Sequence, residues 1–72
     1  MEIDGIDENV FRQYESIRLS GLTNMFDLKK VTEIAEDWDL TALLEFIDDG
    51  NYTKIMKNYN AAKKAGIFGE QK

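Results

Sequence analysis

The sequence predicts an all-α fold, because glycines divide a proline-free chain into segments whose apolar residues recur at helical spacing. The chain has 72 residues, five glycines and no proline. We expect a small bundle or orthogonal array of three core helices plus a C-terminal fourth helix. A chain of this length makes a single helical domain, expected over residues 1–66, with a flexible C-terminal tail at 67–72.

The first predicted helix runs from about Glu8 to Ser20, with Asp7 as its N-cap. Gly21 follows as the left-handed residue that ends the helix, and Leu22 is expected to fold back onto Ile17. The apolar stripe of this helix consists of Val10, Phe11, Tyr14 and Ile17. This stripe is the side of the helix that we expect to face the core.

The second predicted helix runs from about Leu28 to Asp37, with Asp27 as its N-cap. Phe26 and Val31 flank that cap at the spacing of a hydrophobic staple, so we expect the two side chains to touch. The apolar arc of the helix consists of Leu28, Val31, Ile34, Ala35 and Trp38. Because Trp38 lies on this arc, we expect its side chain to be largely buried.

The third predicted helix begins after Asp39, which is placed to act as its N-cap, and ends at the Asp48–Gly50 run. Its wide apolar arc indicates the central helix of the domain and consists of Leu40, Leu43, Leu44, Phe46 and Ile47. Asn51 is the expected cap of the fourth helix. The apolar face of that helix consists of Tyr52, Ile55, Met56, Tyr59 and Ala62.

The junction of the first two helices has the most specific sequence in the chain, YESIRLSGLTNMFD from Tyr14 to Asp27. Its I-R-x-S-G-x-T-N-M-F-D pattern at Ile17–Asp27 resembles the signature of a family of small phage and prophage proteins of bacteria whose biochemistry is unassigned. The resemblance weakens to a loose pattern of apolar positions from about Val10 to Tyr59. It implies an accessory phage gene product, and such small acidic proteins commonly act by binding a host protein.

Two interpretations of this junction remain open. It can be a rigid helix-to-helix corner made by turn formers and caps, or a recognition surface carried on that corner. Met25 joins no helical stripe, so its soft apolar side chain is expected to remain available to a partner. The predicted partner-binding residues are Arg18, Thr23, Asn24 and Met25.

Arg18 falls inside the apolar arc of the first helix, where a charged group needs a partner. One expectation is a buried or half-buried hydrogen bond to Asp27 or to the carbonyl groups of the corner. The other is that the guanidinium anchors an acidic group of a binding partner, since arginine is enriched among interface hot spots.

The composition excludes several kinds of chemistry. The chain has no cysteine and no histidine, so it lacks disulfides, thiol and imidazole catalysis and the usual zinc sites. Asp37, Asp39 and Glu45 do not have the spacing of a calcium loop, and the glycines form no phosphate-binding loop. We therefore predict a non-enzymatic protein with no metal site and no cofactor.

Charge is distributed unevenly along the chain. Residues 1–50 hold thirteen acidic against four basic residues, a net charge of −9, whereas residues 51–72 carry a net charge of +4. An exposed basic stripe on the fourth helix is predicted from Lys54, Lys57 and Lys64, either as a solvated face or as a phosphate-binding surface. The acidic body and basic end favour a partner selected by charge.

The location and the partners follow from the same features. No run reaches the roughly 18 apolar residues that cross a bilayer, and the acidic start lacks a secretory n-region. We expect a protein of the host-cell cytoplasm that binds and modulates a host or phage protein. The alternative is a small nucleic-acid-binding regulator that uses the basic C-terminal helix, and self-association is an open option for so short a chain without staples.

Overall fold

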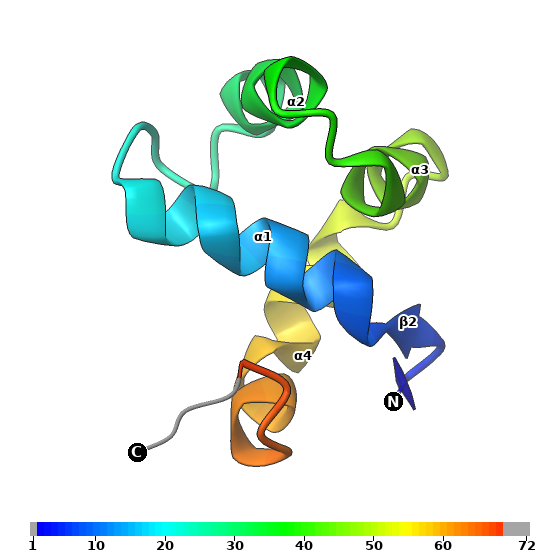
Figure 1. Cartoon of the computed structure of the whole chain (residues 1–72). Helices are drawn as coiled ribbons and strands as arrows, with labels where there is room; N and C mark the ends of the chain where they lie inside the picture. Colours follow the sequence, from blue (N-terminus) through cyan, green and yellow to red (C-terminus); the bar gives the residue numbers. More distant parts are fainter. Residues whose placement is uncertain (1, 69–72) are drawn as a thin grey trace.

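The computed structural model describes residues 2–68 and is a compact array of four helices with a small N-terminal hairpin beside the start of α1 (Figure 1). The elements are β1 (Glu2–Ile3), β2 (Ile6–Asp7), α1 (Glu8–Ser20), α2 (Leu28–Asp37), α3 (Thr41–Asp48) and α4 (Tyr52–Lys64). The predicted all-α fold is thereby confirmed, and α1 and α2 have the bounds that the sequence predicted.

Helix α1 is the centre of the array, because it packs against each of the other three helices. In Figure 1, α2 and α3 lie on one side of α1 and α4 lies on the other. The expectation that α3 is the central helix was wrong. Of its apolar residues only Leu43 is fully buried, and Leu44 and Ile47 are half-buried.

The N-terminal hairpin was not predicted. Asp4 and Gly5 both have left-handed backbones, with φ of 53° and 78°, which is the conformation of a two-residue type I′ turn. The turn pairs Ile3 with Ile6 in antiparallel register, and Ile6 is fully buried beneath the start of α1. The Asp-Gly pair between two isoleucines was the sequence signal for this hairpin.

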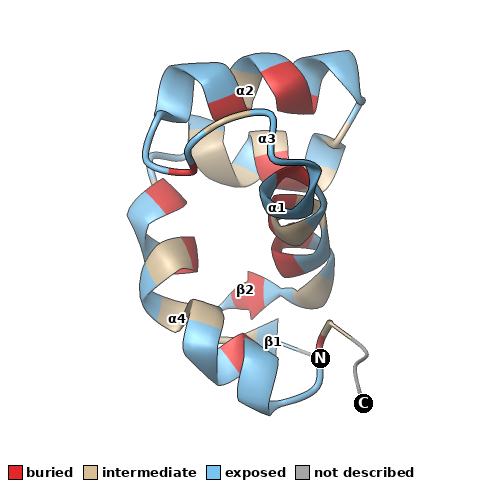
Figure 2. Cartoon of the chain, turned by 90° about the vertical axis from the view of Figure 1, so that its left-hand side faces the viewer, coloured by how far each residue is buried: buried red, intermediate tan, exposed pale blue. Residues whose placement is uncertain are grey.

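One hydrophobic core joins the elements. Figure 2 shows buried positions on the sides of α1 and α4 that face each other. The largest fully buried side chains are Phe11, Ile6, Ile17, Leu43, Ile55 and Val31. Ile67 is also in the core, with 3% of its surface exposed, so the predicted tail starts too early. Residues 69–72 of that tail lie outside the described part of the chain.

The turn between α2 and α3 differs from the sequence prediction in two ways. Trp38 follows the last turn of α2 and is 40% exposed, so the expected burial was wrong. Asp39 has a left-handed backbone (φ 58°) and is not the N-cap of α3. Leu40 occupies the N-cap position and makes no side-chain capping bond. The helix ends here because the Leu40 amide bonds back to the Ala35 carbonyl over 2.8 Å and Asp39 takes the left-handed conformation.

Candidate functional site

The corner between α1 and α2 begins with a helix stop at Gly21. Gly21 has φ of 70°, and its amide donates to the Arg18 carbonyl over 3.3 Å, as predicted for a left-handed C-cap. Leu22 is exposed, however, so the expected packing of Leu22 onto buried Ile17 is not formed. The Leu22 amide instead donates to the Ser20 hydroxyl over 3.2 Å. The turn is therefore closed by polar contacts.

Asn24 and Asp27 shape the second half of the corner. The Asn24 side-chain oxygen accepts from the Phe26 amide over 2.9 Å, and the Asn24 carbonyl accepts from the Asp27 amide. The Asp27 carboxylate accepts from the Lys30 amide and caps α2 as predicted. The Thr23 hydroxyl bonds to the Asn24 carbonyl at 3.4 Å. The polar side chains of this turn thus serve its own structure.

The burial of Met25 and Phe26 is the reverse of what the sequence predicted. Met25 is 8% exposed, so the expectation that it stays available was wrong. Phe26 is 81% exposed, so its predicted contact with buried Val31 is not formed. The cause is Tyr52 of α4, whose hydroxyl donates to the Met25 carbonyl over 2.6 Å and holds this part of the corner against the core. Phe26 is therefore the most exposed apolar side chain of the corner, ahead of Leu22 at 59%.

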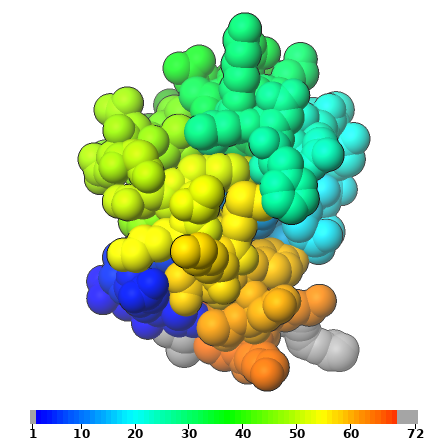
Figure 3. All heavy atoms as spheres, turned by 180° about the vertical axis from the view of Figure 1, so that it is seen from behind, coloured from blue at the N-terminus to red at the C-terminus, as the bar shows by residue number. Residues whose placement is uncertain are grey.

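A groove lies between this corner, α1 and α4. It has a volume of about 590 Å³ and is lined by Tyr14, Arg18, Asn24, Met25, Phe26, Met56, Lys57 and Tyr59. A second hollow of about 270 Å³ continues it and shares Phe26 and Met56 as walls. The other residues of this second hollow are Leu28, Ile47, Gly50, Tyr52 and Thr53. In Figure 3 the corner (cyan to green) borders the first turns of α4 (yellow) on this face.

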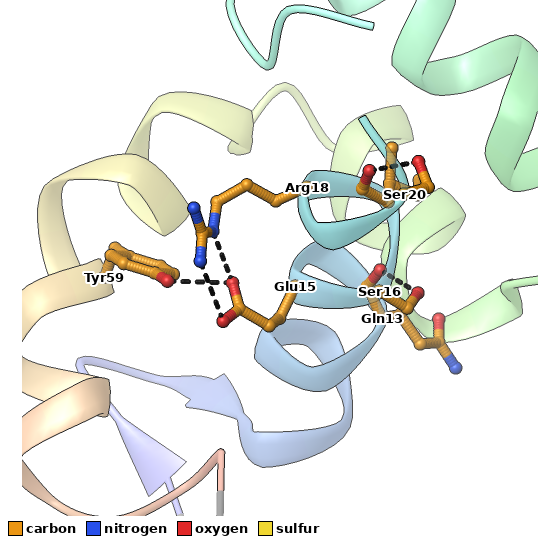
Figure 4. Close-up of polar contacts among 7 residues, drawn as sticks. Gln13, Glu15, Ser16, Arg18, Ser20 and Tyr59 are labelled. Carbon is orange, nitrogen blue, oxygen red and sulfur yellow. Dashed lines mark hydrogen bonds and ion pairs between the residues drawn. The ribbon is translucent and has the colours of Figure 1, made fainter. Parts of the chain in front are cut away.

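Arg18 is held at the groove by Glu15 and Tyr59 (Figure 4). Its Nε donates to Glu15 Oε1 over 2.6 Å and its Nη2 to Glu15 Oε2 over 3.2 Å. The Tyr59 hydroxyl donates to the same carboxylate over 2.8 Å, and the guanidinium lies 5.4 Å from the centre of the Tyr59 ring. The predicted bond from Arg18 to Asp27 or the corner is not formed, because Glu15 lies one turn away on the same helix.

This cluster keeps its charges. Burial alone would raise the pKa of Glu15, but the hydrogen bonds from Arg18 and Tyr59 outweigh it and hold that pKa below its ordinary value. The hydrogen bond to Glu15 raises the pKa of Arg18. Burial, followed by the bond to Glu15, raises the pKa of Tyr59, which keeps its hydroxyl a donor. Arg18 is thus a fixed cation whose side chain is still 42% exposed.

The predicted basic stripe is on the surface of α4. Lys54, Lys57 and Lys64 are all exposed, and Lys57 is the member that lines the groove. Tyr52, the aromatic residue at the start of the same helix, is buried and bonds to the Met25 carbonyl of the corner. Within residues 2–68 no group of acidic side chains is placed to hold a metal ion. No helix in that range is long and apolar enough to cross a membrane.

Of the predicted partner-binding residues, Arg18, Asn24 and Met25 line the groove, but four other residues that define the site were not predicted to belong to it. Met56 and Tyr59 were assigned to the core face of α4, and no role was predicted for Glu15. Phe26 was assigned to a staple, and no sequence signal marks it as exposed. Predicted Thr23 is half-buried and does not line the groove.

The corner and the groove fall largely within a region shared with a known family. Residues 6–57 match the family model described as Domain of unknown function (DUF5049). This match covers β2 to the first half of α4 and all the groove residues except Tyr59. No curated protein and no solved structure gives a significant match.

Proposed function

The chain belongs to the DUF5049 family, a domain of unknown function, and we propose that it is a non-enzymatic accessory protein that binds and modulates another protein. The observation that carries this proposal is Phe26, which is 81% exposed at the rim of two adjoining apolar hollows. Exposed apolar surface next to a groove is typical of sites that bind protein partners. Aromatic side chains are also frequent among the residues that dominate such interfaces.

The side chains that line the groove are suited to binding and do not include a catalytic nucleophile with its base. Its polar side chains are Arg18, Lys57, Asn24 and the tyrosine hydroxyls. The Asn24 oxygen is already bonded to the Phe26 amide, and the Tyr59 hydroxyl to Glu15. A nucleophile beside a general base is absent from this lining, so the arrangement supports binding over acid/base or covalent chemistry.

The proposed origin and partner rest on the resemblance carried by the signature at Ile17–Asp27. Its resemblance to small phage and prophage proteins supports a phage or prophage gene product that acts in the host-cell cytoplasm. The proposed partner is a host or phage protein. Nucleic-acid binding through Lys54, Lys57 and Lys64 has less support, because the burial of Tyr52 removes one of the aromatics available to stack on bases.

The test is quantitative capture of proteins from host lysate by three tagged forms of the chain. Wild type and Leu19→Ser are expected to retain the same partner, and Phe26→Ser is expected to lose it. Leu19 is the matched control, because it is 70% exposed on α1 and lines neither hollow of the groove. The proposal is wrong if Phe26→Ser retains the same proteins as wild type, or if the chain binds mixed-sequence DNA with an affinity that falls steeply with salt.

A further inference from the structure

The groove beside Phe26 carries two cationic side chains next to apolar surface, and this combination points to the chemistry of its occupant. We infer that it takes a segment of a partner protein that combines apolar side chains with at least one carboxylate. This inference rests on the proposed function and adds which kind of segment the groove selects.

The charged residues of the groove are both cations. Arg18 of α1 and Lys57 of α4 are the charged members of the lining. Lys57 forms no ion pair with any carboxylate of residues 2–68. Arg18 is paired with Glu15, but its side chain remains 42% exposed. A carboxylate that enters the groove therefore meets one unpaired cation and one partly compensated cation.

The apolar part of the groove provides the surface for the remaining side chains of the segment. Tyr14 and Tyr59 lie at one end with ring centres 5.8 Å apart, and Phe26 and Met56 join this end to the second hollow. Met56 is half-buried and unbranched, so it can adapt to side chains of different shape. The Tyr59 ring is fixed by its bond to Glu15, which lowers the entropic cost of contacting it.

A second copy of this chain fits the same groove less well. A two-fold dimer through this face places each patch against itself, and the cations Arg18 and Lys57 then approach the same cations of the other copy. Like charges brought together at an interface oppose association. An acidic segment of another protein removes that repulsion and gives Lys57 a partner. A foreign segment is therefore the occupant that the charges favour.

The test uses a library of random linear peptides displayed against the immobilised full chain. Selected peptides are expected to be enriched in Asp or Glu together with aromatic or aliphatic residues. Charge reversal by Lys57→Glu is expected to weaken the strongest selected peptide at least roughly tenfold. Lys54→Glu is the matched control, because Lys54 is exposed on the same helix but lies outside the lining of both hollows, and it should change affinity little.

Several results would overturn the inference. The first is that the selected peptides are neutral or basic. The second is that Lys57→Glu and Lys54→Glu weaken peptide binding equally. The third is that every selected peptide still binds the Phe26→Ser variant. A wild-type dimer that Phe26→Ser dissociates, measured by analytical ultracentrifugation, would identify a second copy as the occupant. Each of these is distinguishable from failure of the proposed function, which is measured by Phe26-dependent capture of an intact protein.

Discussion

The Tyr52 hydroxyl donates a hydrogen bond of 2.6 Å to the Met25 carbonyl and thereby ties α4 to the corner between α1 and α2. The bond sits between the two walls of the groove. Met25 immediately precedes Phe26, and Tyr52 lies one helical turn before Met56. Because Phe26 and Met56 are shared by both hollows, this one contact fixes the relative position of the residues that define the proposed binding surface.

Tyr52→Phe is expected to reduce the free energy of unfolding by about 1–2 kcal/mol, because it leaves the Met25 carbonyl without its buried donor. Burial also raises the pKa of Tyr52, so the hydroxyl is a donor throughout the neutral range. Urea titration followed by circular dichroism measures the loss. Tyr59→Phe is the control and should cost less, because its bond to Glu15 is only partly buried. A Tyr52→Phe variant as stable as wild type would show that the bond does not hold the corner.

Gly21→Ala is expected to destabilise the fold by roughly 1 kcal/mol, because alanine is strained at a φ of 70°. Apart from the residues next to Gly21 in the chain, no atom of residues 2–68 lies within 4 Å of the position that a β-carbon would occupy, so the cost is conformational and not steric crowding. Gly21→Asn should lose less, since asparagine tolerates the left-handed region better. Thermal melts of the three proteins give the comparison. Equal losses for the two variants would point to a cause other than backbone strain.

The stability of the fold is expected to fall in acid through Glu15. Its pKa is held below the ordinary value of 4.5, so its stabilising contribution is fully present above that value and is lost as the pH falls through the lowered pKa of the folded state. Denaturant titrations at pH values from about 7 to about 3 should therefore show a smaller acid-dependent loss for Glu15→Gln than for wild type. Glu36→Gln, at an exposed position of α2, is the control and should follow wild type.

Ile67→Ala is expected to cost about 2–4 kcal/mol, because Ile67 is buried in the core after the end of α4. Its amide also bonds to the Ala62 carbonyl over 3.2 Å. Leu19→Ala, at a position 70% exposed, should stay close to wild type. Chemical denaturation of both variants provides the measurement. A loss for Ile67→Ala no larger than for Leu19→Ala would return residue 67 to the tail that the sequence predicted.

The helices could be predicted from sequence because their signals are local. Asp7 caps α1, Gly21 ends it and Asp27 caps α2, and each of these residues acts on amides or backbone angles within a few positions of itself. The spacing of apolar residues also identified the buried positions of α1, such as Phe11 and Ile17. Local capping chemistry and helical periodicity therefore account for the part of the fold that was predicted correctly.

The groove could not be predicted because it depends on contacts between distant residues. The sequence predicted an exposed Met25, but Phe26 is the exposed residue. We attribute this to the hydrogen bond from Tyr52 to the Met25 carbonyl, which joins positions 27 residues apart. The Tyr59 bond to Glu15 joins positions 44 apart. Nothing in the sequence around Glu15 or Tyr59 indicates that these two side chains meet. The hairpin is different, since Asp4 and Gly5 gave a local signal that was overlooked.

The most direct measurement is photo-crosslinking from position 26 in the host cell. A photoreactive phenylalanine analogue in place of Phe26 keeps an aromatic side chain at the rim of the groove, and the same analogue at Leu19 probes an exposed position that lines neither hollow. Illumination is expected to give a discrete protein adduct from position 26 and none of the same mass from position 19. Identical adducts from both positions, or none from position 26, would contradict the claim that this groove binds a partner protein.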